Sequence, residues 1–260
     1  MEFEKWLIIG TDARLKSLAK KLSNGNRTVY YKSETVWSEE LNLTAFNFQP
    51  DVVVLPIHPL PIQVAAVLGL SNAKIFAGKL SEEWKEILKN HDIHYYLQDE
   101  SFIWKNAQLT AEGFVSFFYN TKQAVYGKKF IITGFGRVAK MLAHVLKNIG
   151  GDVAIAVRSH VQLNEAKAFR YEAVYLDEVD LVKGDYFINT IPAKWFDEKF
   201  NSAIEMPIYD LASSPGCLQD DVKRSNYELL PALPGKYFPQ DAAHVLYESI
   251  IGQIRGSKEC

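Results

Sequence analysis

Short apolar runs alternate with amphipathic stretches along the chain. Runs such as "WLIIG" and "DVVVLPI" are typical of buried β-strands, and the apolar spacing of "ARLKSLAKKL" indicates a helix. Strand, helix and strand repeated in this way predict parallel sheets covered on both faces. Further strands are expected at "KIFAG", "IHYYLQ", "KFIITG", "DVAIAV", "EAVYL", "DYFINTI" and "PIYDLA".

A weak internal repeat divides the pattern into two parts. "LIIGTDARLKSLAKKL" and "FIITGFGRVAKMLAHVL" each read as strand, tight turn and amphipathic helix, which predicts two Rossmann-like, doubly wound parallel-sheet α/β domains. We expect a flavodoxin- or Rossmann-like substrate domain over residues 1–108. A second domain over 109–239 includes a bridging helix at 110–126, and a helix at 240–256 packs back on the first domain. The expected ligand site is a cleft between the domains, outside the carboxyl ends of the strands.

The composition excludes several classes of protein. The 260 residues are 48% hydrophobic and 23% charged, with a net charge of -2, so the sequence has no basic footprint for nucleic acid. No apolar run has the length of a membrane span, and the acidic start "MEFEKW" is unlike a secretory signal. Cys217 and Cys260 have no metal-ligand spacing and read as ordinary thiols. These features predict a cytoplasmic protein.

The segment "GFGRVA", residues 134–139, has the G-x-G-x-x-A pattern of a dinucleotide site. It follows a predicted strand and opens a predicted helix, whose N–H groups and dipole suit a pyrophosphate. Gly134 permits the turn, Gly136 lets the phosphates approach, and Ala139 lets helix and strand pack closely. A plain strand-to-helix turn is the alternative. The expected cofactor contacts are Gly134, Phe135, Gly136, Arg137 and Val138.

The end of the next predicted strand, "DVAIAV", indicates which dinucleotide binds. An acidic residue at this place would bind the ribose 2′-hydroxyl and repel a 2′-phosphate, but the chain has Arg158 and Ser159, followed by His160. A guanidinium and a hydroxyl suit a phosphate, so we expect NADP(H). The alternative is a solvated arginine beside NAD.

The first turn, "GTDAR", differs from the second. Asp12 stands where a second glycine would be, and a carboxylate there would repel a pyrophosphate. The N-terminal domain is therefore not expected to bind a second nucleotide. Asp12 and Arg14 can instead face a substrate, with Arg14 pairing with a carboxylate. The alternative is a helix-capping Asp12 beside a surface Arg14.

Two later loops follow predicted strands at the same edge of the second sheet. We expect Thr190, Ile191 and Pro192 to border the nicotinamide ribose, and Leu211 and Ala212 to lie near the nicotinamide amide. The alternative is that the prolines and glycine of these loops only shape turns.

Together the motifs resemble the A component of dipicolinate synthase. The similarity is carried by "INTIP", "DLASSPG" and "LPALPGKYFPQDAAHVL" downstream of "GFGR", and by "IIGTDAR" and "NAQLTAEG" before them. The resemblance implies two Rossmann-like domains, as in D-2-hydroxyacid dehydrogenases. It also implies NADP-dependent oxidation of dihydrodipicolinate to dipicolinate, a spore metabolite of sporulating bacteria. The flavoprotein-like B component of dipicolinate synthase is the implied partner, and we also expect a homo-oligomer.

The implied reaction needs anchors for two carboxylates and a base, and the sequence offers candidates for both. Arg14 is the expected carboxylate anchor beside Asp12, and Asn106, Thr110 and Ser213 can add hydrogen bonds. Glu112, in "TAEG", matches a family motif position and can act as a base or orient a donor. Its alternative is a capping glutamate in the first turn of the bridging helix. Where the family commonly has an arginine, a glycine and Lys-Thr-Ala-Gly, this chain has Ser214, Cys217 and Gln240-Asp241-Ala242-Ala243.

Two other functions stay open at this stage. One is an NADP-dependent reductase of a small 2-oxo or 2-hydroxy acid, for which His244 falls near the usual region. The other is a catalytically weakened paralogue that binds NADP(H) and a partner, since basic residues of the family are missing. None of the six histidines has metal-ligand spacing, and no serine or cysteine has the setting of a nucleophile.

Overall fold

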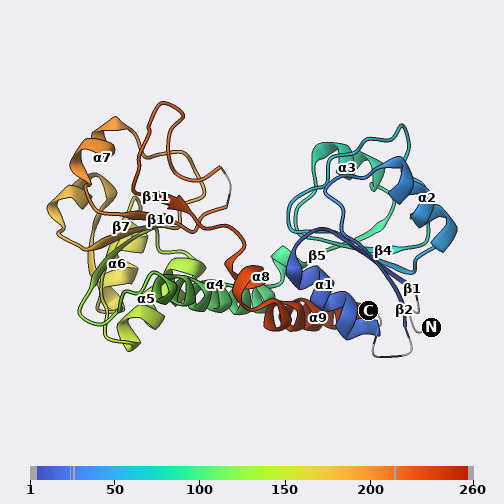
Figure 1. Cartoon of the computed structure of the whole chain (residues 1–260), viewed down its shortest axis with the longest axis horizontal. Coiled ribbons are helices and arrows are strands. Elements are labelled where there is room, and N and C mark those ends of the chain that lie inside the picture. Colours follow the sequence, from blue (N-terminus) through green and yellow to red (C-terminus); the bar gives the residue numbers. More distant parts are fainter. Residues whose placement is uncertain (1–4, 24, 26, 214, 257–260) are drawn as a thin grey trace. The chain divides into compact units, whose positions relative to one another are not determined.

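A computed structural model describes residues 5–23, 25, 27–213 and 215–256 of the chain (Figure 1). The chain forms two compact units. Unit 1 comprises Met1–Asn106 and Pro234–Cys260, and unit 2 comprises Ala107–Leu233. Among the described residues, no helix is long and apolar enough to cross a membrane. Ser214 and Cys260, singled out above, lie outside the described residues.

Unit 1 is built on a five-stranded parallel sheet with the order β2-β1-β3-β4-β5. This is the flavodoxin-like order, in which the connections leave β1 and β3 in opposite directions. The strands are β1 (Lys5–Ile9), β2 (Thr28–Lys32), β3 (Val52–Val54), β4 (Lys74–Ala77) and β5 (Asp92–Tyr95). The helices are α1 (Ala13–Ser23), α2 (Glu39–Phe48), α3 (Glu82–Ile87), η1 (Tyr96–Gln98), α8 (Leu233–Tyr237, entered from the last residue of unit 2) and α9 (Pro239–Gly256).

Strand β1 shows how both faces of this sheet are covered. Its side chains alternate between two separate apolar cores, as the period of a strand requires. Trp6 and Ile8 pack in one core with α1 and α9, whereas Leu7 and Ile9 pack in the other with α2 and α3. Because β1 is buried on both faces, it reads in the sequence as one continuous apolar run.

Unit 2 is built on a six-stranded parallel sheet with the order β11-β10-β9-β6-β7-β8. This is the order of the dinucleotide-binding Rossmann fold, with its switch point between β6 and β9. The strands are β6 (Lys129–Thr133), β7 (Asp152–Val157), β8 (Glu172–Tyr175), β9 (Tyr186–Asn189), β10 (Ile208–Asp210) and β11 (Tyr227–Leu229). The helices are α5 (Arg137–Asn148), α6 (His160–Ala168), η2 (Leu176–Leu181), α7 (Glu198–Ala203) and the later part of α4 (Glu100–Asn120).

Aromatic side chains pack α4 onto one face of the second sheet. Phe114 and Phe118 of α4 contact the ring of Phe130 on β6, and Phe118 also contacts Tyr186 on β9. Burial raises the pKa of Tyr186, so its phenol stays neutral. The opposite face carries a separate core that includes residues of β9, η2 and α7.

The predicted fold class, two doubly wound parallel α/β domains, is confirmed by these two sheets. The bridging helix differs from the prediction, because α4 starts at Glu100 and not at Thr110, and ends at Asn120. Asp99 accounts for the earlier start, since its carboxylate accepts hydrogen bonds from the N–H groups of Ser101 (2.9 Å) and Phe102 (3.4 Å).

Candidate functional site

The glycine turn of unit 2 joins β6 to α5 at the carboxyl edge of the sheet. Gly134 has a φ of 82°, a conformation that favours glycine. A Cβ atom there would lie 3.1 Å from Oγ1 of Thr190 and 3.2 Å from Cγ1 of Ile191. The turn therefore needs glycine both for its backbone and for its contact with the loop after β9.

The second glycine leaves the start of α5 open. A Cβ atom on Gly136 would meet no atom within 4 Å, and the first turn of α5 contains no acidic residue. Ala139 is fully buried against the strand side, as expected from the motif. Unpaired N–H groups at such a helix start attract anions. The turn therefore offers a free approach to a diphosphate.

The three other predicted residues of this turn have different settings. Arg137 is exposed and Val138 is half-buried. Phe135 is buried, with its ring edge-on to Phe169 and Tyr171, so only its backbone can meet a ligand.

A buried polar network fixes the loops around the turn. Asn189, at the end of β9, is fully buried and its Oδ1 accepts a hydrogen bond from Oγ1 of Thr133 on β6 (2.8 Å). The same oxygen accepts from Nε1 of Trp195 (3.1 Å), and Nδ2 donates to Oδ1 of Asp210 on β10 (2.8 Å). Thr190 donates from Oγ1 to the carbonyl of Thr133 (2.6 Å). The strand ends of β6, β9 and β10 are therefore cross-linked by side chains.

Asp210 is the acceptor centre of this network and is fully buried. Its Oδ1 also accepts from the N–H of Ala212 (2.9 Å), and its Oδ2 accepts from the N–H of Cys217 (2.7 Å) and the hydroxyl of Tyr227 (2.9 Å). Burial, together with the charge of Asp210, raises the pKa of the Cys217 thiol and of the Tyr227 phenol. Cys217 is therefore an unreactive thiol, and the N–H of Ala212 is already paired inside the loop.

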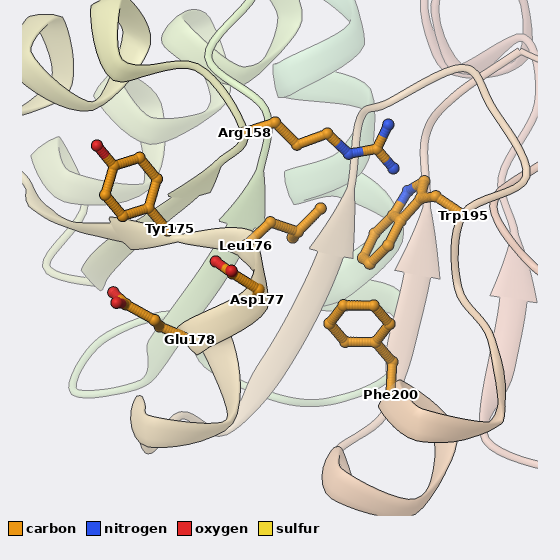
Figure 2. A pocket seen from close by; sticks show the side chains of 7 residues that line it. All are labelled: Arg158, Tyr175, Leu176, Asp177, Glu178, Trp195 and Phe200. Carbon is orange, nitrogen blue, oxygen red and sulfur yellow. The ribbon is translucent and has the colours of Figure 1, made fainter.

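A cavity of about 500 Å³ opens at the ends of β7 and β8, with further walls from the loop after β9 and from α7 (Figure 2). We call it the strand-end pocket. Four of its residues present apolar or aromatic surface, and three are charged. Its lining residues are Arg158, Tyr175, Leu176, Asp177, Glu178, Trp195 and Phe200.

Arg158 extends into the strand-end pocket from the end of β7. Its guanidinium lies 5.8 Å from the ring centre of Trp195, and in the described part of the chain it makes no ion pair or hydrogen bond. Ser159 is the N-cap residue that precedes α6, and its side chain makes no capping hydrogen bond. Nδ1 of His160 lies 2.9 Å from the hydroxyl of Tyr175. The pocket therefore presents an unpaired guanidinium directly before the start of α6, and with the open turn this arrangement fits an adenine dinucleotide.

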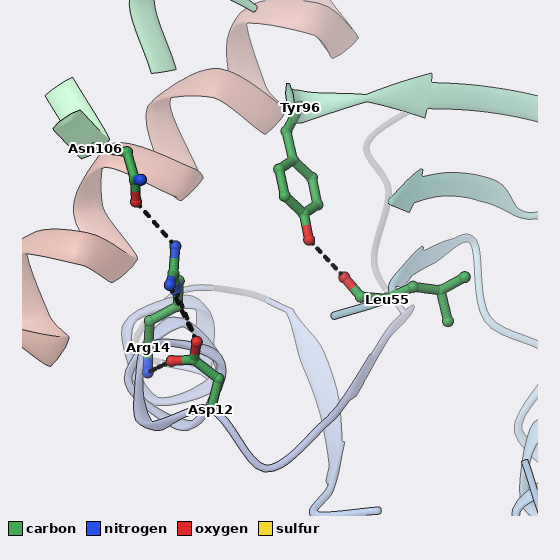
Figure 3. Close-up of polar contacts among 5 residues, drawn as sticks. All are labelled: Asp12, Arg14, Leu55, Tyr96 and Asn106. Carbon is green, nitrogen blue, oxygen red and sulfur yellow. Dashed lines mark hydrogen bonds and ion pairs between the residues drawn. The ribbon is translucent and has the colours of Figure 1, made fainter. Parts of the chain in front are cut away.

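In unit 1, Asp12 and Arg14 pair with each other (Figure 3). Oδ2 of Asp12 accepts from Nε (3.2 Å) and Nη2 (3.0 Å) of Arg14, and Nη1 of Arg14 donates to Oδ1 of Asn106 (3.1 Å). Arg14 is only 2% exposed, so the alternative of a surface arginine is wrong. A Cβ atom on Gly235 would lie 2.3 Å from Oδ1 of Asp12, so α8 also packs tightly on this cluster.

The remaining predicted residues lie on α4, in the segment after β10, and on α9. Glu112 lies in the middle of α4, where its Oε1 accepts from Nε2 of Gln108 (2.6 Å), so the first-turn capping alternative is wrong. Thr110 is buried on the same helix, and Ser213 is exposed after β10. His244 is exposed on α9, with Nε2 3.4 Å from Oε1 of Glu248.

Several pocket residues were not singled out from the sequence. Trp195 and Phe200 come from the loop after β9 and from α7, and Leu176 and Asp177 come from η2. The usable signal was the segment "AKWFDEKF", which has three aromatic residues soon after the "NTIP" loop, Trp195 and Phe200 among them.

Neither a protein-family model nor a curated protein sequence matches the chain. The crystal structure of the dipicolinate synthase A chain from Bacillus subtilis matches it with a TM-score of 0.76 and 20% sequence identity. The match covers 99% of this chain and 98% of that one. The chain has the fold of the A component of dipicolinate synthase.

A second structure of this component, from Bacillus halodurans, matches with a TM-score of 0.74 and 20% identity, over 96% of this chain and 97% of that one. The likeness extends to a structure of D-2-hydroxyisocaproate dehydrogenase, with a TM-score of 0.54 and 10% identity, over 95% and 94% of the two chains. The resemblance to the A component of dipicolinate synthase and to D-2-hydroxyacid dehydrogenases is thereby confirmed for the fold.

Proposed function

We propose that the chain is a cytoplasmic, NADP-dependent oxidoreductase that oxidises dihydrodipicolinate to dipicolinate, with a second protein component as its partner. The observation that carries the proposal is Arg158, a guanidinium without a carboxylate partner in the described residues, on the wall of the strand-end pocket. An NAD site would have an acidic side chain at this strand end. The choice of dihydrodipicolinate as the substrate rests on the resemblance in the sequence and on the likeness of the fold to the A component of dipicolinate synthase.

In this proposal, different segments of unit 2 bind different parts of the cofactor. The backbone of residues 134–138 and the start of α5 hold the pyrophosphate, and Arg158 and Ser159 hold the 2′-phosphate. The loops at 190–192 and 211–212 border the nicotinamide. Bound NADP⁺ supplies the hydride acceptor, while the protein supplies binding and orientation.

The substrate side of the proposal rests on different residues from those first expected. Asp12, Arg14 and Asn106 satisfy one another, so we give them a structural role in place of binding a carboxylate. Glu112, Thr110 and Ser213 stay as proposed substrate contacts, with Glu112 accepting a proton or orienting a donor. Formation of an aromatic ring drives the reaction, so a weak base is sufficient.

The test is the ultraviolet absorbance of dipicolinate formed from fresh dihydrodipicolinate, with NADP⁺ or NAD⁺, in the presence and absence of a candidate second component. Product with NADP⁺ in preference to NAD⁺ is the expected result. Tight NADP(H) binding without product in either condition would contradict the proposed reaction and favour the weakened paralogue.

Arg158→Asp tests the cofactor assignment directly. The change removes a charge-assisted contact and adds a repelling carboxylate, so the ratio of kcat/KM for NADP⁺ over NAD⁺ should fall by about 10- to 150-fold, the factor for roughly 1.5–3 kcal/mol. Lys167→Asp on α6 is the control, because it makes the same charge change outside the pocket lining. An equal ratio in both variants would refute the role of Arg158.

A reductase of a small 2-oxo acid is the second candidate, and the pair of His244 and Glu248 favours it. Such reductases use a histidine beside a carboxylate as the proton donor. His244→Ala should abolish 2-oxo acid reduction if this candidate is correct, and should leave dihydrodipicolinate oxidation unchanged if the first is.

A further inference from the structure

A second cavity lies in unit 1, where α1 and α9 meet. Its volume is about 330 Å³, at the lower end of the range of small-molecule sites, which is about 300–1,000 Å³. The two helices hold each other in place, because Leu18 of α1 shares an apolar core with Leu246 and Ile250 of α9. We call this cavity the α1–α9 pocket. Its lining residues are Ser17, Lys20, Lys21, Gln240 and Ala243.

Two ammonium groups line the α1–α9 pocket, and among the described residues that line it none is acidic. Lys20 makes no hydrogen bond or ion pair in the described part of the chain. The ammonium of Lys21 lies 5.2 Å from the ring centre of Tyr247, and the neighbouring Glu248 is already paired with Lys105 at 2.8 Å. A hollow lined by charge of one sign concentrates ions of the opposite sign, so an anion is the ligand that this pocket attracts.

Neutral donors adjoin the two ammonium groups. The hydroxyl of Ser17 and the side-chain amide of Gln240 can each donate a hydrogen bond to an anion. The pocket also lies against the first turn of α9, an 18-residue helix, and the first N–H groups of a helix have no partner within it. Asp241 stands in the same turn but is not among the lining residues. Charged and neutral donors from two helices therefore surround one small volume.

The kind of donor favours a phosphate over a carboxylate. No arginine is among the described lining residues, so the pocket lacks the planar fork that binds a carboxylate through two parallel hydrogen bonds. A lysine ammonium acts as a compact charge with three donors, which suits the tetrahedral oxygens of a phosphate. A phosphate monoester also carries a charge of about −1.5 to −2 at pH 7, enough to pair with two lysines.

We infer that the α1–α9 pocket binds a small phosphate-bearing ligand, with Lys20 and Lys21 holding the phosphate. The pocket belongs to unit 1 alone, so the inference does not depend on the proposed dinucleotide site in unit 2. Apart from Ala243 and the stems of the two lysines, the lining offers little apolar surface. The rest of the ligand is therefore short and polar.

The test is an NMR titration of the ¹⁵N-labelled full chain with glycerol 3-phosphate at constant, low ionic strength. The amide signals of residues 17–21 and 240–243 should shift on binding, which both locates the ligand and gives its Kd. Succinate, a dicarboxylate, should bind at least about fivefold more weakly. Inorganic phosphate, titrated in parallel, distinguishes an ester from the free anion as the preferred ligand.

Two variants test the lining residues. Lys20→Gln should weaken the binding of glycerol 3-phosphate about fivefold, because it removes one ammonium group. Gln240→Glu should remove measurable binding, because it places a carboxylate of the same size in the lining. Lys16→Gln is the matched control, since Lys16 is an exposed lysine of α1 that does not line the pocket.

Three results would each overturn the inference. They are a Kd of Lys20→Gln equal to that of the control, an equal affinity for succinate and glycerol 3-phosphate, and shifts confined to the glycine turn of unit 2. Lys20 and Gln240 are both exposed, so the variants should keep the unfolding midpoint of the unchanged protein.

Discussion

Asp210→Asn is the change that tests the buried network most sharply. The side chain keeps its size, but one acceptor oxygen becomes an NH₂ group. Both oxygens of Asp210 face donors, namely Asn189 and Ala212 on one side and Cys217 and Tyr227 on the other. The amide nitrogen therefore meets a donor whichever way it turns.

The geometry allows the cost to be estimated. The new NH₂ group is better placed at Oδ2, because the Tyr227 hydroxyl can rotate and accept from it. The N–H of Cys217 then loses its partner in a fully buried site, which costs about 1–3 kcal/mol. Loss of the charge-assisted character of the remaining bonds adds about 1 kcal/mol. We expect unit 2 to lose about 2–4 kcal/mol of its free energy of unfolding.

Fluorine NMR of protein labelled with fluorotryptophan can follow unit 2 by itself during urea denaturation. Trp195 is the one tryptophan in the sequence of unit 2, and Trp195→Phe assigns its resonance. Asp220→Asn serves as the control, because Asp220 pairs with Lys194 at the surface with its side chain 89% exposed. A loss below about 1 kcal/mol in Asp210→Asn, or one equal to that of the control, would refute the reasoning.

Two further predictions concern the glycine turn and a surface ion pair. Gly136→Ala should leave the unfolding midpoint nearly unchanged, since its Cβ meets nothing, yet weaken NADP(H) binding at least about tenfold in calorimetric titrations, because the methyl group enters the diphosphate approach. Equal affinity of Gly136→Ala and the unchanged protein for NADP(H) would contradict the binding of the diphosphate at this turn. The Lys147 ammonium, 2.8 Å from Asp152, lowers the pKa of that carboxyl. A carboxyl group whose pKa is lower in the folded than in the unfolded protein stabilises the fold at pH values above its unfolded pKa of about 3.9. This stabilisation is lost as the pH falls through the pKa of the group in the folded protein. Asp152→Asn should therefore cost up to about 1 kcal/mol at neutral pH and nothing in acid, as denaturation on both sides of pH ~3.9 would show.

The central strands were predictable from the sequence because they are buried on both faces. Strands β1, β6 and β7 are continuous apolar runs, and the turn after β6 has a glycine pattern with a known geometry. The edge strands β2 and β11 were missed. Each pairs on one side only and is partly exposed, so "TVYYK" and "YEL" have no apolar run to mark them.

The site was less predictable, because its side chains come from segments distant in sequence. Spacing placed Arg14 and Asp12 at a strand end, but it could not show that Asn106, far along the chain, meets that arginine in a buried position. In the same way, the strand-end pocket needs η2, α7 and the end of β7 to come together. Only local motifs such as "GFGRVA" carry their geometry within the sequence.

Unit 1 is assembled from segments on both sides of unit 2, which affects how the protein is made. Leu246 and Ile250 of α9 share a core with Leu18 and Leu22 of α1, yet the ribosome makes α9 only after all of unit 2. Until α9 is made, the apolar face of the β1–β5 sheet that carries α1 is therefore only partly covered, although unit 2 already has all of its residues. Unit 1, which is synthesised first, is therefore the unit that completes its folding last. Its partly covered apolar sheet face is the surface on which a chaperone would act.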